Sequence, residues 1–357
     1  MHILIASDAW APQVNGVVRS LEHTAREASS FGARVSFLTP QDFRTVPMPT
    51  YPEVRLALAT RAMVARRMDD IGADFVHIAT EGPIGVLARR VCLSRGRVFT
   101  TSYHTRFPEY LAARAPVPRA LSYAWLRRFH NAGAGIMVAT ATIEAELKKR
   151  GFLRLMHWSR GVDSELFRPR DEAERAADRQ IDPLLDLPRP IFLYVGRVAV
   201  EKNIGAFLDL DLPGSKLVVG DGPARAELQA KHPKARFLGL REGEALARAY
   251  AAADVFMFPS LTDTFGIVLL EALASGLPVA AFPVAGPLDV IGSAPADAPV
   301  GVLDNDLRRA ALAALEIGRE APRTFALRHS WRACTRQFLD NVEQAQTSAE
   351  RARALAG

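Results

Sequence analysis

Cysteine is scarce in this chain, whose 357 residues include only Cys92 and Cys334. Two cysteines exclude both a disulfide framework and a Cys₄ zinc site. Long hydrophobic runs are also missing, because no apolar stretch reaches the roughly 18 residues that a membrane span needs. The first apolar stretch has no basic leader before it, which favours a buried strand over a signal peptide. We therefore expect a cytoplasmic protein in a reducing compartment.

Lysine is rare as well, since six of the 45 basic residues are lysines. The basic residues are also unevenly placed: residues 1–170 hold 24 Lys and Arg against 14 Asp and Glu, and residues 171–357 hold 21 against 25. This asymmetry favours an anionic partner for the first half, although an arginine-rich composition is an alternative explanation. No dense basic run occurs and the second half is acidic, so we expect no nucleic-acid partner.

Short apolar stretches alternate with helical patterns along both halves of the chain. The predicted strands are 3–6, 33–39, 75–79, 98–102, 136–139, 190–196, 216–220, 235–239, 255–259 and 278–282. This alternation predicts an α/β protein with two Rossmann-like parallel-sheet domains, whose strand ends face each other across a ligand cleft. We predict domains at residues 1–165 and 190–330, a charged, proline-punctuated linker at 166–189, and a helical segment at 331–357 that packs back on the first domain.

One turn carries two cations directly after a predicted strand. The strand ends at Gly196, and Arg197 and Lys202 follow in the turn and at a helix start. Two cations at the carboxyl end of a strand suit a diphosphate, and each charge-assisted hydrogen bond contributes about 1.5–3 kcal/mol. A solvated surface turn is the alternative. Glycine-rich strand ends also occur at 219–223 and at 237–240, and the backbone of the latter can pair with the edge of a base.

Two acids flank the start of an apolar helix. Asp263 and Glu271 are eight residues apart, so they lie on a similar face about two turns from one another. Thr264, Phe265 and Gly266 come just before the helix, where backbone N–H groups lack helical partners. One acid would hold sugar hydroxyls and the other a ribose. The alternatives are an N-cap for Asp263 and a salt bridge for Glu271.

Two residues of the first half also follow predicted strands. Gly16 opens a helix after the first strand, where a glycine lets a ligand approach the backbone and a helix N-terminus favours an anion. The turn is not a GxGxxG motif, so it does not indicate a nicotinamide cofactor. His104 lies just past the strand 98–102, where it would bind a ligand and stabilise developing charge. A plain loop glycine and a structural histidine are the alternatives.

Taken in order, these motifs resemble glycosyltransferase family 4, the retaining nucleotide-sugar glycosyltransferases of GT-B fold. The resemblance covers nearly the whole chain and depends on the order and spacing of Asn15-Gly16, His104, Gly161-Val162-Asp163 with Phe167-Arg168-Pro169, Gly196-Arg197 with Glu201-Lys202, Gly220-Asp221-Gly222-Pro223, and Asp263 with Glu271. Segments such as Ser159–Asp163 are similar to a bacterial subgroup of mannosyl-, glucosyl- and sulfoquinovosyl-type transferases, several of which act on lipids.

The resemblance implies a role for each position. Gly16 would place its N–H near the donor diphosphate, and His104 would contact the transferred sugar. Arg197 and Lys202 would bind the diphosphate and stabilise it as it leaves. The other implied contacts are sugar hydroxyls for Asp263, ribose hydroxyls for Glu271, backbone N–H bonds from Phe265, Gly266 and Ile267, and the base for the stretch that ends at Leu240. The family usually has Glu at the position of Asp263, a departure that bears on sugar selectivity.

The expected reaction is the transfer of a hexose from a UDP- or GDP-sugar with retained anomeric configuration. It needs no metal and no cofactor, and the triplets Asp209-Leu210-Asp211 and Asp304-Asn305-Asp306 are interpreted as surface turns. The expected acceptor is a membrane lipid, held by an enzyme on the inner face of the cytoplasmic membrane through the basic amphipathic segments 61–68, 106–114 and 121–129. Ordinary amphipathic helices with a core face are the alternative for these segments. A soluble acceptor (polysaccharide, polyol or sugar phosphate) and a nucleotide-sugar epimerase are the alternatives for the function.

Overall fold

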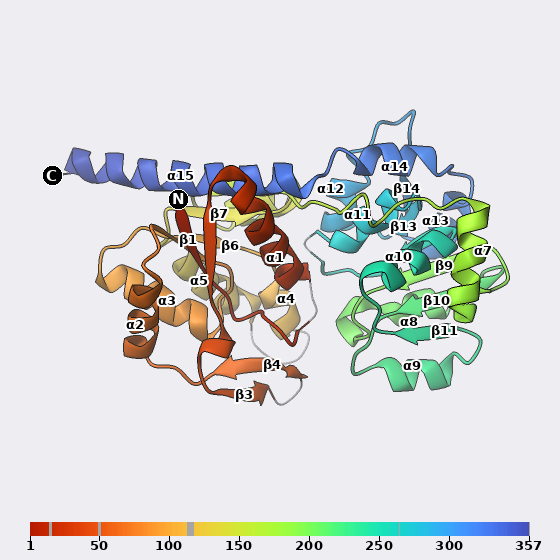
Figure 1. The fold of residues 1–357 in the computed structure, drawn as a ribbon, viewed down its shortest axis with the longest axis horizontal. Coiled ribbons are helices and arrows are strands. Elements are labelled where there is room, and N and C mark those ends of the chain that lie inside the picture. The colour runs from red at the N-terminus through yellow and green to blue at the C-terminus, as the bar shows by residue number, and fades with distance from the viewer. Residues whose placement is uncertain (14–15, 49–50, 113–117, 264, 357) are drawn as a thin grey trace. The chain divides into compact units, whose positions relative to one another are not determined.

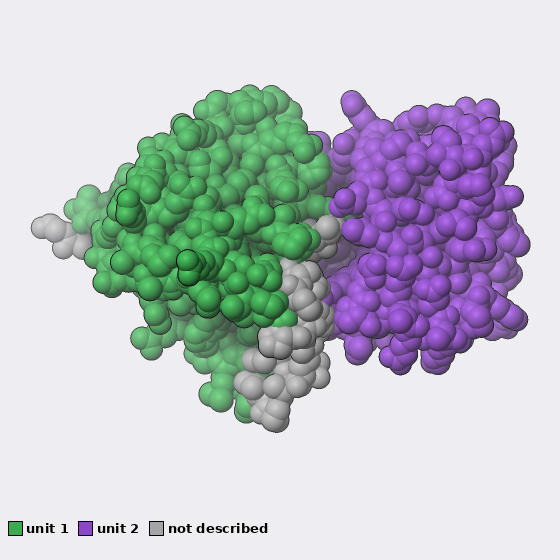
Figure 2. Space-filling model, turned by 60° about the horizontal axis from the view of Figure 1, so that its bottom comes forward, with its two compact units in different colours: residues 1–160, 331–357 green, residues 161–330 purple. Residues whose placement is uncertain are grey.

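The computed structural model divides into two compact units, residues 1–160 with 331–357 and residues 161–330 (Figure 2). It describes residues 1–13, 16–48, 51–112, 118–263 and 265–356. Each unit contains one six-stranded parallel sheet with helices packed against it (Figure 1). The predicted α/β architecture with two parallel sheets is therefore confirmed.

The sheet of unit 1 has the order β2-β1-β5-β6-β7-β8. Its strands are β1 (His2–Ala6), β2 (Arg34–Leu38), β5 (Phe75–Ile78), β6 (Thr100–Ser102), β7 (Gly135–Val138) and β8 (Leu155–His157). The helices between them are α1 (Gly16–Ala28), α2 (Arg61–Ile71), α3 (Pro83–Ser94), α4 (Phe107–Ala112), α5 (Arg119–His130) and α6 (Ala141–Lys149). β1 is an apolar run because both faces of the sheet are covered, and its Ile3, Leu4 and Ile5 are completely buried.

Two further elements complete unit 1. A short antiparallel hairpin joins β3 (Thr45–Met48) to β4 (Tyr51–Ala57). The long helix α15 (Trp331–Ala356) returns to this unit and runs along α1 (Figure 1). Its Phe338 packs on the ring of Trp158 at 4.9 Å, and its Asn341 donates to the His157 carbonyl oxygen at 2.7 Å. Burial of this helix face therefore completes the core beside β7 and β8.

The sheet of unit 2 has the order β11-β10-β9-β12-β13-β14. Its strands are β9 (Ile191–Val195), β10 (Ser215–Val219), β11 (Arg236–Gly239), β12 (Val255–Phe258), β13 (Val279–Ala281) and β14 (Gly301–Leu303). Its helices are α7 (Glu172–Ile181), α8 (Ile204–Leu208), α9 (Arg225–Lys231), α10 (Gly243–Ala252), α11 (Ile267–Ala274), α12 (Ala285–Val290), α13 (Leu307–Ala314) and α14 (Glu320–Ala326). The strand order reverses between β9 and β12, and such a switch point is where open α/β sheets bind ligands.

The range 166–189, which the sequence predicts to be a linker, lies within unit 2 and contains α7. Asp171 and Glu174 form a capping box at the start of this helix. Arg170 then ties the helix to the rest of the unit, because it forms ion pairs with Asp178 at 2.5 Å and with Glu244 of α10. Charges in the range that the sequence predicts as a linker thus cap and pair within unit 2.

Candidate active site

The loops after β9 and β12 lie on the two sides of the switch point in unit 2 and are joined by side chains. Lys202, from the short turn of helix at Val200–Lys202, forms an ion pair with Asp263 of the loop after β12. The neighbouring Asn203 side chain donates to the Pro259 carbonyl oxygen at 3.0 Å. These contacts place one predicted phosphate ligand and one predicted sugar ligand side by side. Asp263 is not the N-cap of α11, since Gly266 holds that position.

Arg197 sits between Gly196 and this turn and is partly exposed. The Tyr194 hydroxyl of β9 donates to the Arg197 carbonyl oxygen at 2.9 Å, which fixes the backbone that carries the guanidinium. Arg197 and Lys202 therefore start from the same short loop at the carboxyl end of β9. Their predicted contact with a diphosphate stays a prediction.

Glycines let the loop after β10 lie directly against the loop after β9. A Cβ on Gly220, whose φ is +136°, would lie 1.9 Å from the Gly196 carbonyl oxygen. A Cβ on Gly222 would lie 2.4 Å from the Val198 carbonyl oxygen, and the Val198 N–H donates to the Asp221 carbonyl oxygen at 2.9 Å. A side chain at either glycine would force the loops apart. These glycines therefore shape the site by packing one loop on the other.

The N-terminus of α11 faces the same edge of the sheet. Its N-cap, Gly266, has a φ of +82°, and no side chain in the described part of the chain caps the helix there. Phe265 is buried just before it, and Ile267 is the first helical residue. The first N–H groups of a helix have no partner within it, so this end suits an anion. Thr264, which precedes Phe265, lies outside the described residues.

Glu271 is buried in the second turn of α11. Its exposed fraction is 3%, and the Tyr250 hydroxyl of α10 donates to its Oε2 at 2.8 Å. A buried carboxylate needs such a donor, because burial without one is costly. Tyr250 is a residue that the sequence did not single out, since a tyrosine in a helix carries no signal of its partner. The predicted ribose contact of Glu271 stays a prediction.

Leu240 follows β11 and is exposed. Gly239 precedes it with a φ of +73°, and its carbonyl oxygen accepts from the Gly220 N–H at 2.8 Å. The stretch 237–240 therefore lies beside the loop after β10. Its predicted contact with a base stays a prediction.

In unit 1, Gly16 begins α1 and His104 follows β6, while Asn15 lies outside the described residues. The His104 Nδ1 lies 3.0 Å from a guanidinium nitrogen of Arg160. Burial, together with the positive charge of Arg160, lowers the pKa of His104 well below its usual range. The ring is therefore neutral at physiological pH. Both a sugar contact and a structural role remain compatible with this placement.

Asp8 is a charged residue at the end of β1 that the sequence analysis did not assign to a site. Its carboxylate accepts from the Ile84 N–H at 2.8 Å and the Gly85 N–H at 3.1 Å, both in the first turn of α3. The Thr80 hydroxyl donates to it at 2.9 Å, and burial raises the pKa of Asp8. These bonds identify Asp8 as a side chain that fixes the start of α3.

Comparison with known proteins shows which family this chain belongs to. Residues 14–166 match the family model described as Glycosyltransferase Family 4, and residues 189–316 match the model described as Glycosyl transferases group 1. A GDP-mannose-dependent alpha-mannosyltransferase of Mycobacterium tuberculosis is 33% identical over 82% of this chain and 81% of its own. The chain belongs to glycosyltransferase family 4. It is a glycosyltransferase that takes its sugar from a nucleotide sugar.

The names of other proteins similar to this family 4 glycosyltransferase mention different sugars or acceptors. The sulfoquinovosyl transferase SQD2 of Arabidopsis thaliana is 31% identical, covering 78% of this chain and 58% of that protein. An alpha-monoglucosyldiacylglycerol synthase of Streptococcus pneumoniae is 25% identical, covering 79% and 71%. HepE of Anabaena in complex with UDP-glucose superposes with a TM-score of 0.72 at 14% identity, covering 96% of this chain and all of that one, which shows the GT-B fold.

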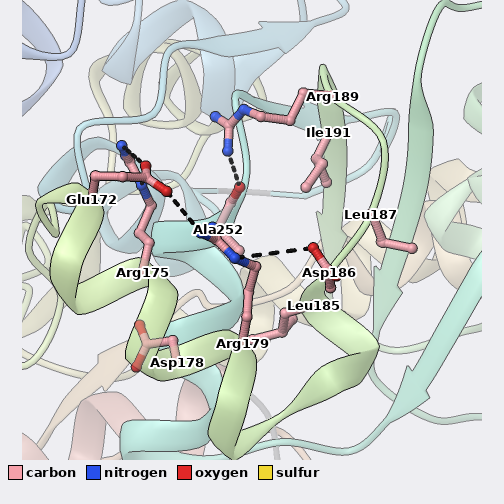
Figure 3. A pocket seen from close by; sticks show the side chains of 10 residues that line it. All are labelled: Glu172, Arg175, Asp178, Arg179, Leu185, Asp186, Leu187, Arg189, Ile191 and Ala252. Atoms are coloured by element: carbon pink, nitrogen blue, oxygen red, sulfur yellow. Dashed lines mark hydrogen bonds and ion pairs between the residues drawn. The ribbon is translucent and has the colours of Figure 1, made fainter.

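A pocket of about 280 Å³ lies elsewhere in unit 2 of this glycosyltransferase, beside α7 and at the amino end of β9 (Figure 3). Its arginines face carboxylates: Arg175 and Arg179 both bind Glu172, at 2.8 and 2.7 Å, and Arg189 binds Asp254. The predicted donor residues all follow the carboxyl ends of strands, at the opposite edge of the sheet. The loops after β9 and β12, which contain the predicted donor residues of unit 2, are therefore separate from this pocket, and their role in donor binding stays a prediction.

Among the described residues, no helix is both long and apolar enough to cross a bilayer. The same part of the chain contains no group of three His, Cys, Asp or Glu side chains that could hold a metal ion. In the two Asp-x-Asp triplets, Asp209 pairs with Lys231 at 3.2 Å and Asp304 pairs with Arg309 at 2.6 Å. Asp306 caps α13. Each of these carboxylates has a local partner.

Proposed function

We propose that this protein transfers a hexose from a UDP- or GDP-sugar to a membrane lipid, such as diacylglycerol or a glycolipid, with retained anomeric configuration and without a metal. The part of this proposal that concerns the nucleotide-sugar donor rests on the contact of Lys202 with Asp263 across the switch point of the second sheet. It brings a cation for the diphosphate and a carboxylate for sugar hydroxyls to the place where such sheets bind ligands.

The step is the one that the resemblance to retaining family 4 glycosyltransferases implies. The bond between the sugar's anomeric carbon and the β-phosphate oxygen breaks, and the acceptor oxygen bonds to that carbon on the same face. The leaving phosphate oxygen takes the acceptor's proton. Charge builds on the diphosphate in this step, so Arg197, Lys202 and the N-terminus of α11 lower the barrier by stabilising that charge. His104 is the contact to the transferred sugar, Glu271 holds the ribose, and Gly16 approaches the diphosphate.

Support for a lipid acceptor comes from the surface of α5. Leu121 and Trp125 are exposed by 64% and 45%, and Arg128 follows on the same helix face. Arg127 precedes Arg128 and is exposed as well. Apolar tips rimmed by arginines suit the interface of an anionic membrane. The diacylglycerol synthase among the similar proteins agrees with this acceptor.

A partition experiment tests the proposal. The protein is incubated with radiolabelled UDP- and GDP-sugars and a bacterial lipid extract, and the label is then divided between chloroform and water. Label from one donor in chloroform supports the lipid acceptor and identifies base and sugar together. Label confined to water for every donor refutes it. The aqueous products then distinguish transfer to a soluble acceptor from epimerisation, which alters the donor without any acceptor.

A further inference from the structure

Arg160 is the last residue of the first segment of unit 1, and its guanidinium is buried beside the predicted catalytic histidine. Its Nη1 donates to the carbonyl oxygens of Trp158 and Ser159, each at 2.8 Å. The guanidinium also lies over the Trp158 ring, 4.5 Å from its centre. All these partners belong to unit 1. The guanidinium is therefore held in one orientation, with its Nη2 3.0 Å from His104 Nδ1.

The chemistry of this contact settles which ring nitrogen of His104 carries the hydrogen. A guanidinium has N–H donors and no acceptor. Burial lowers the pKa of Arg160 to about 10, so the group is still protonated at neutral pH. His104 Nδ1 must then be the acceptor, with its lone pair toward Arg160. In a neutral imidazole the hydrogen is consequently on Nε2.

The surroundings keep the ring in that neutral form. Burial and the charge of Arg160 both lower the pKa of His104, and two further histidines, His77 and His130, face it from β5 and α5. His77 is bonded to Thr100 and Ser102 at 2.8 Å each, and burial lowers its pKa to about 3. The carboxylate of Glu81 in this cluster lies 3.0 Å from His130 Nε2. A neutral His104 that accepts at Nδ1 carries its hydrogen on Nε2 and is an N–H donor there.

We propose that Arg160 is a positioning residue that fixes His104 as the Nε2–H tautomer, so that this nitrogen donates a hydrogen bond to the transferred sugar. The inference rests on the proposed function for the place of His104 near the sugar. It adds that His104 acts neither as a base toward the acceptor nor as a cation toward the diphosphate. The residue that sets its chemistry is Arg160, at the point where the chain leaves unit 1.

Nitrogen NMR of the histidine rings tests the tautomer without any substrate. The full chain is labelled with ¹⁵N-histidine, and the His104 signals are assigned by their loss in His104→Gln. The expected spectrum shows a protonated Nε2 and an unprotonated Nδ1 from pH 5 to 8. In Arg160→Met the Nδ1 donor is gone, so the His104 signals shift toward a mixture of tautomers. A hydrogen on Nδ1 in the wild-type protein overturns the inference.

Kinetics separate positioning from folding. Arg160→Met should lower kcat by about tenfold or more with donor KM nearly unchanged, since one charge-assisted bond to a catalytic group is lost. Arg160→Lys keeps the positive charge and should recover part of kcat. This recovery would show that the loss in Arg160→Met is not caused by unfolding. Arg154→Met is the control, because Arg154 donates to the Gly133 carbonyl oxygen at 3.1 Å in the same unit, away from His104. Equal kcat in Arg160→Met and wild type, with unshifted ring signals, overturns the inference.

The two proposals fail in different ways. If no donor is consumed but the ring nitrogens behave as expected, the proposed function fails and the tautomer assignment stands as a property of the fold. If sugar is transferred and Arg160→Met changes neither the spectrum nor kcat, the transferase assignment stands and the positioning role fails.

Discussion

Lys202 and Asp263 form an ion pair across the switch point of the second sheet. Their side chains are 22% and 17% exposed, so the pair is shielded more than a surface contact and still reachable by a ligand. Each partner is expected to bind a different part of the donor. Donor binding would therefore exchange this pair for two contacts to the substrate, one to phosphate and one to sugar.

The exchange makes the Asp263→Asn variant informative. Loss of the carboxylate releases Lys202 and removes a negative charge beside the diphosphate site, so the nucleoside diphosphate should bind several-fold more tightly. Transfer should fall by at least tenfold, because a contact to the sugar is lost. Calorimetry with UDP and GDP, together with the transfer assay, measures both. Loss of nucleotide binding in this variant would show that Asp263 does not compete with the ligand for Lys202.

Tyr250→Phe tests the support of Glu271. The variant removes the hydroxyl that donates to the buried carboxylate at 2.8 Å, which should destabilise unit 2 by about 1–3 kcal/mol. Donor KM should rise while kcat changes less, since the ribose is remote from the reacting bond. Scanning calorimetry and kinetics give the two readouts. Tyr123→Phe in unit 1, whose hydroxyl donates to Glu109 at 2.8 Å, is the control and should leave donor KM unchanged.

Acid should weaken unit 1 through His77. Burial lowers its folded pKa to about 3, against 6.5 when the chain is unfolded. The unfolded state therefore takes up a proton that the folded state does not, and the contribution of His77 is complete above pH 6.5 and is lost as the pH falls toward 3. The loss is about 2 kcal/mol by pH 5.

Denaturant titrations at pH 8 and pH 5 measure this effect. All four tryptophans, Trp10, Trp125, Trp158 and Trp331, lie in unit 1, so their fluorescence follows that unit alone. The pH dependence should flatten in His77→Gln and persist in His157→Gln, which changes an exposed histidine. If the free energy of unfolding of His77→Gln still falls from pH 8 to pH 5 as in the wild-type protein, other groups cause the acid sensitivity.

The α5 surface predicts binding to anionic vesicles. The double variant Leu121→Gln with Trp125→Gln should lose sedimentation with phosphatidylglycerol vesicles, and Arg127→Gln with Arg128→Gln should weaken it by about 1 kcal/mol per arginine. Arg308→Gln with Arg309→Gln removes the same charge from unit 2 and is the control. Vesicle binding that is unchanged in the α5 variants and does not depend on lipid charge would contradict the prediction that α5 binds a membrane.

The alternation of short apolar stretches with helical patterns was enough to predict the two parallel sheets, because central strands such as β1 and β9 are buried apolar runs. Strand-end placement likewise predicted that Arg197 and Lys202 share one loop. The contact between Lys202 and Asp263 was not predictable, since it depends on β9 and β12 being neighbours although they are not consecutive in the chain.

Other parts of the structure were hidden from the sequence for similar reasons. Charges at 166–189 suggested a linker, but ion pairs such as Arg170 with Asp178 hold α7 in unit 2. The Tyr250–Glu271 bond and the Arg160–His104 contact join residues that are 21 and 56 positions apart. Only the packing of helices and strand ends brings such pairs together.

Nucleotide titration into two arginine variants tests the central claim that the strand-end loops of unit 2 hold the diphosphate. UDP and GDP are titrated calorimetrically into the wild-type protein, Arg197→Ala and Arg175→Ala, the last of which alters the pocket beside α7. We expect Arg197→Ala to weaken the binding of the preferred nucleotide by about 10- to 100-fold, and Arg175→Ala to leave it unchanged. Unaltered affinity in Arg197→Ala, with loss in Arg175→Ala, would contradict this placement of the donor site.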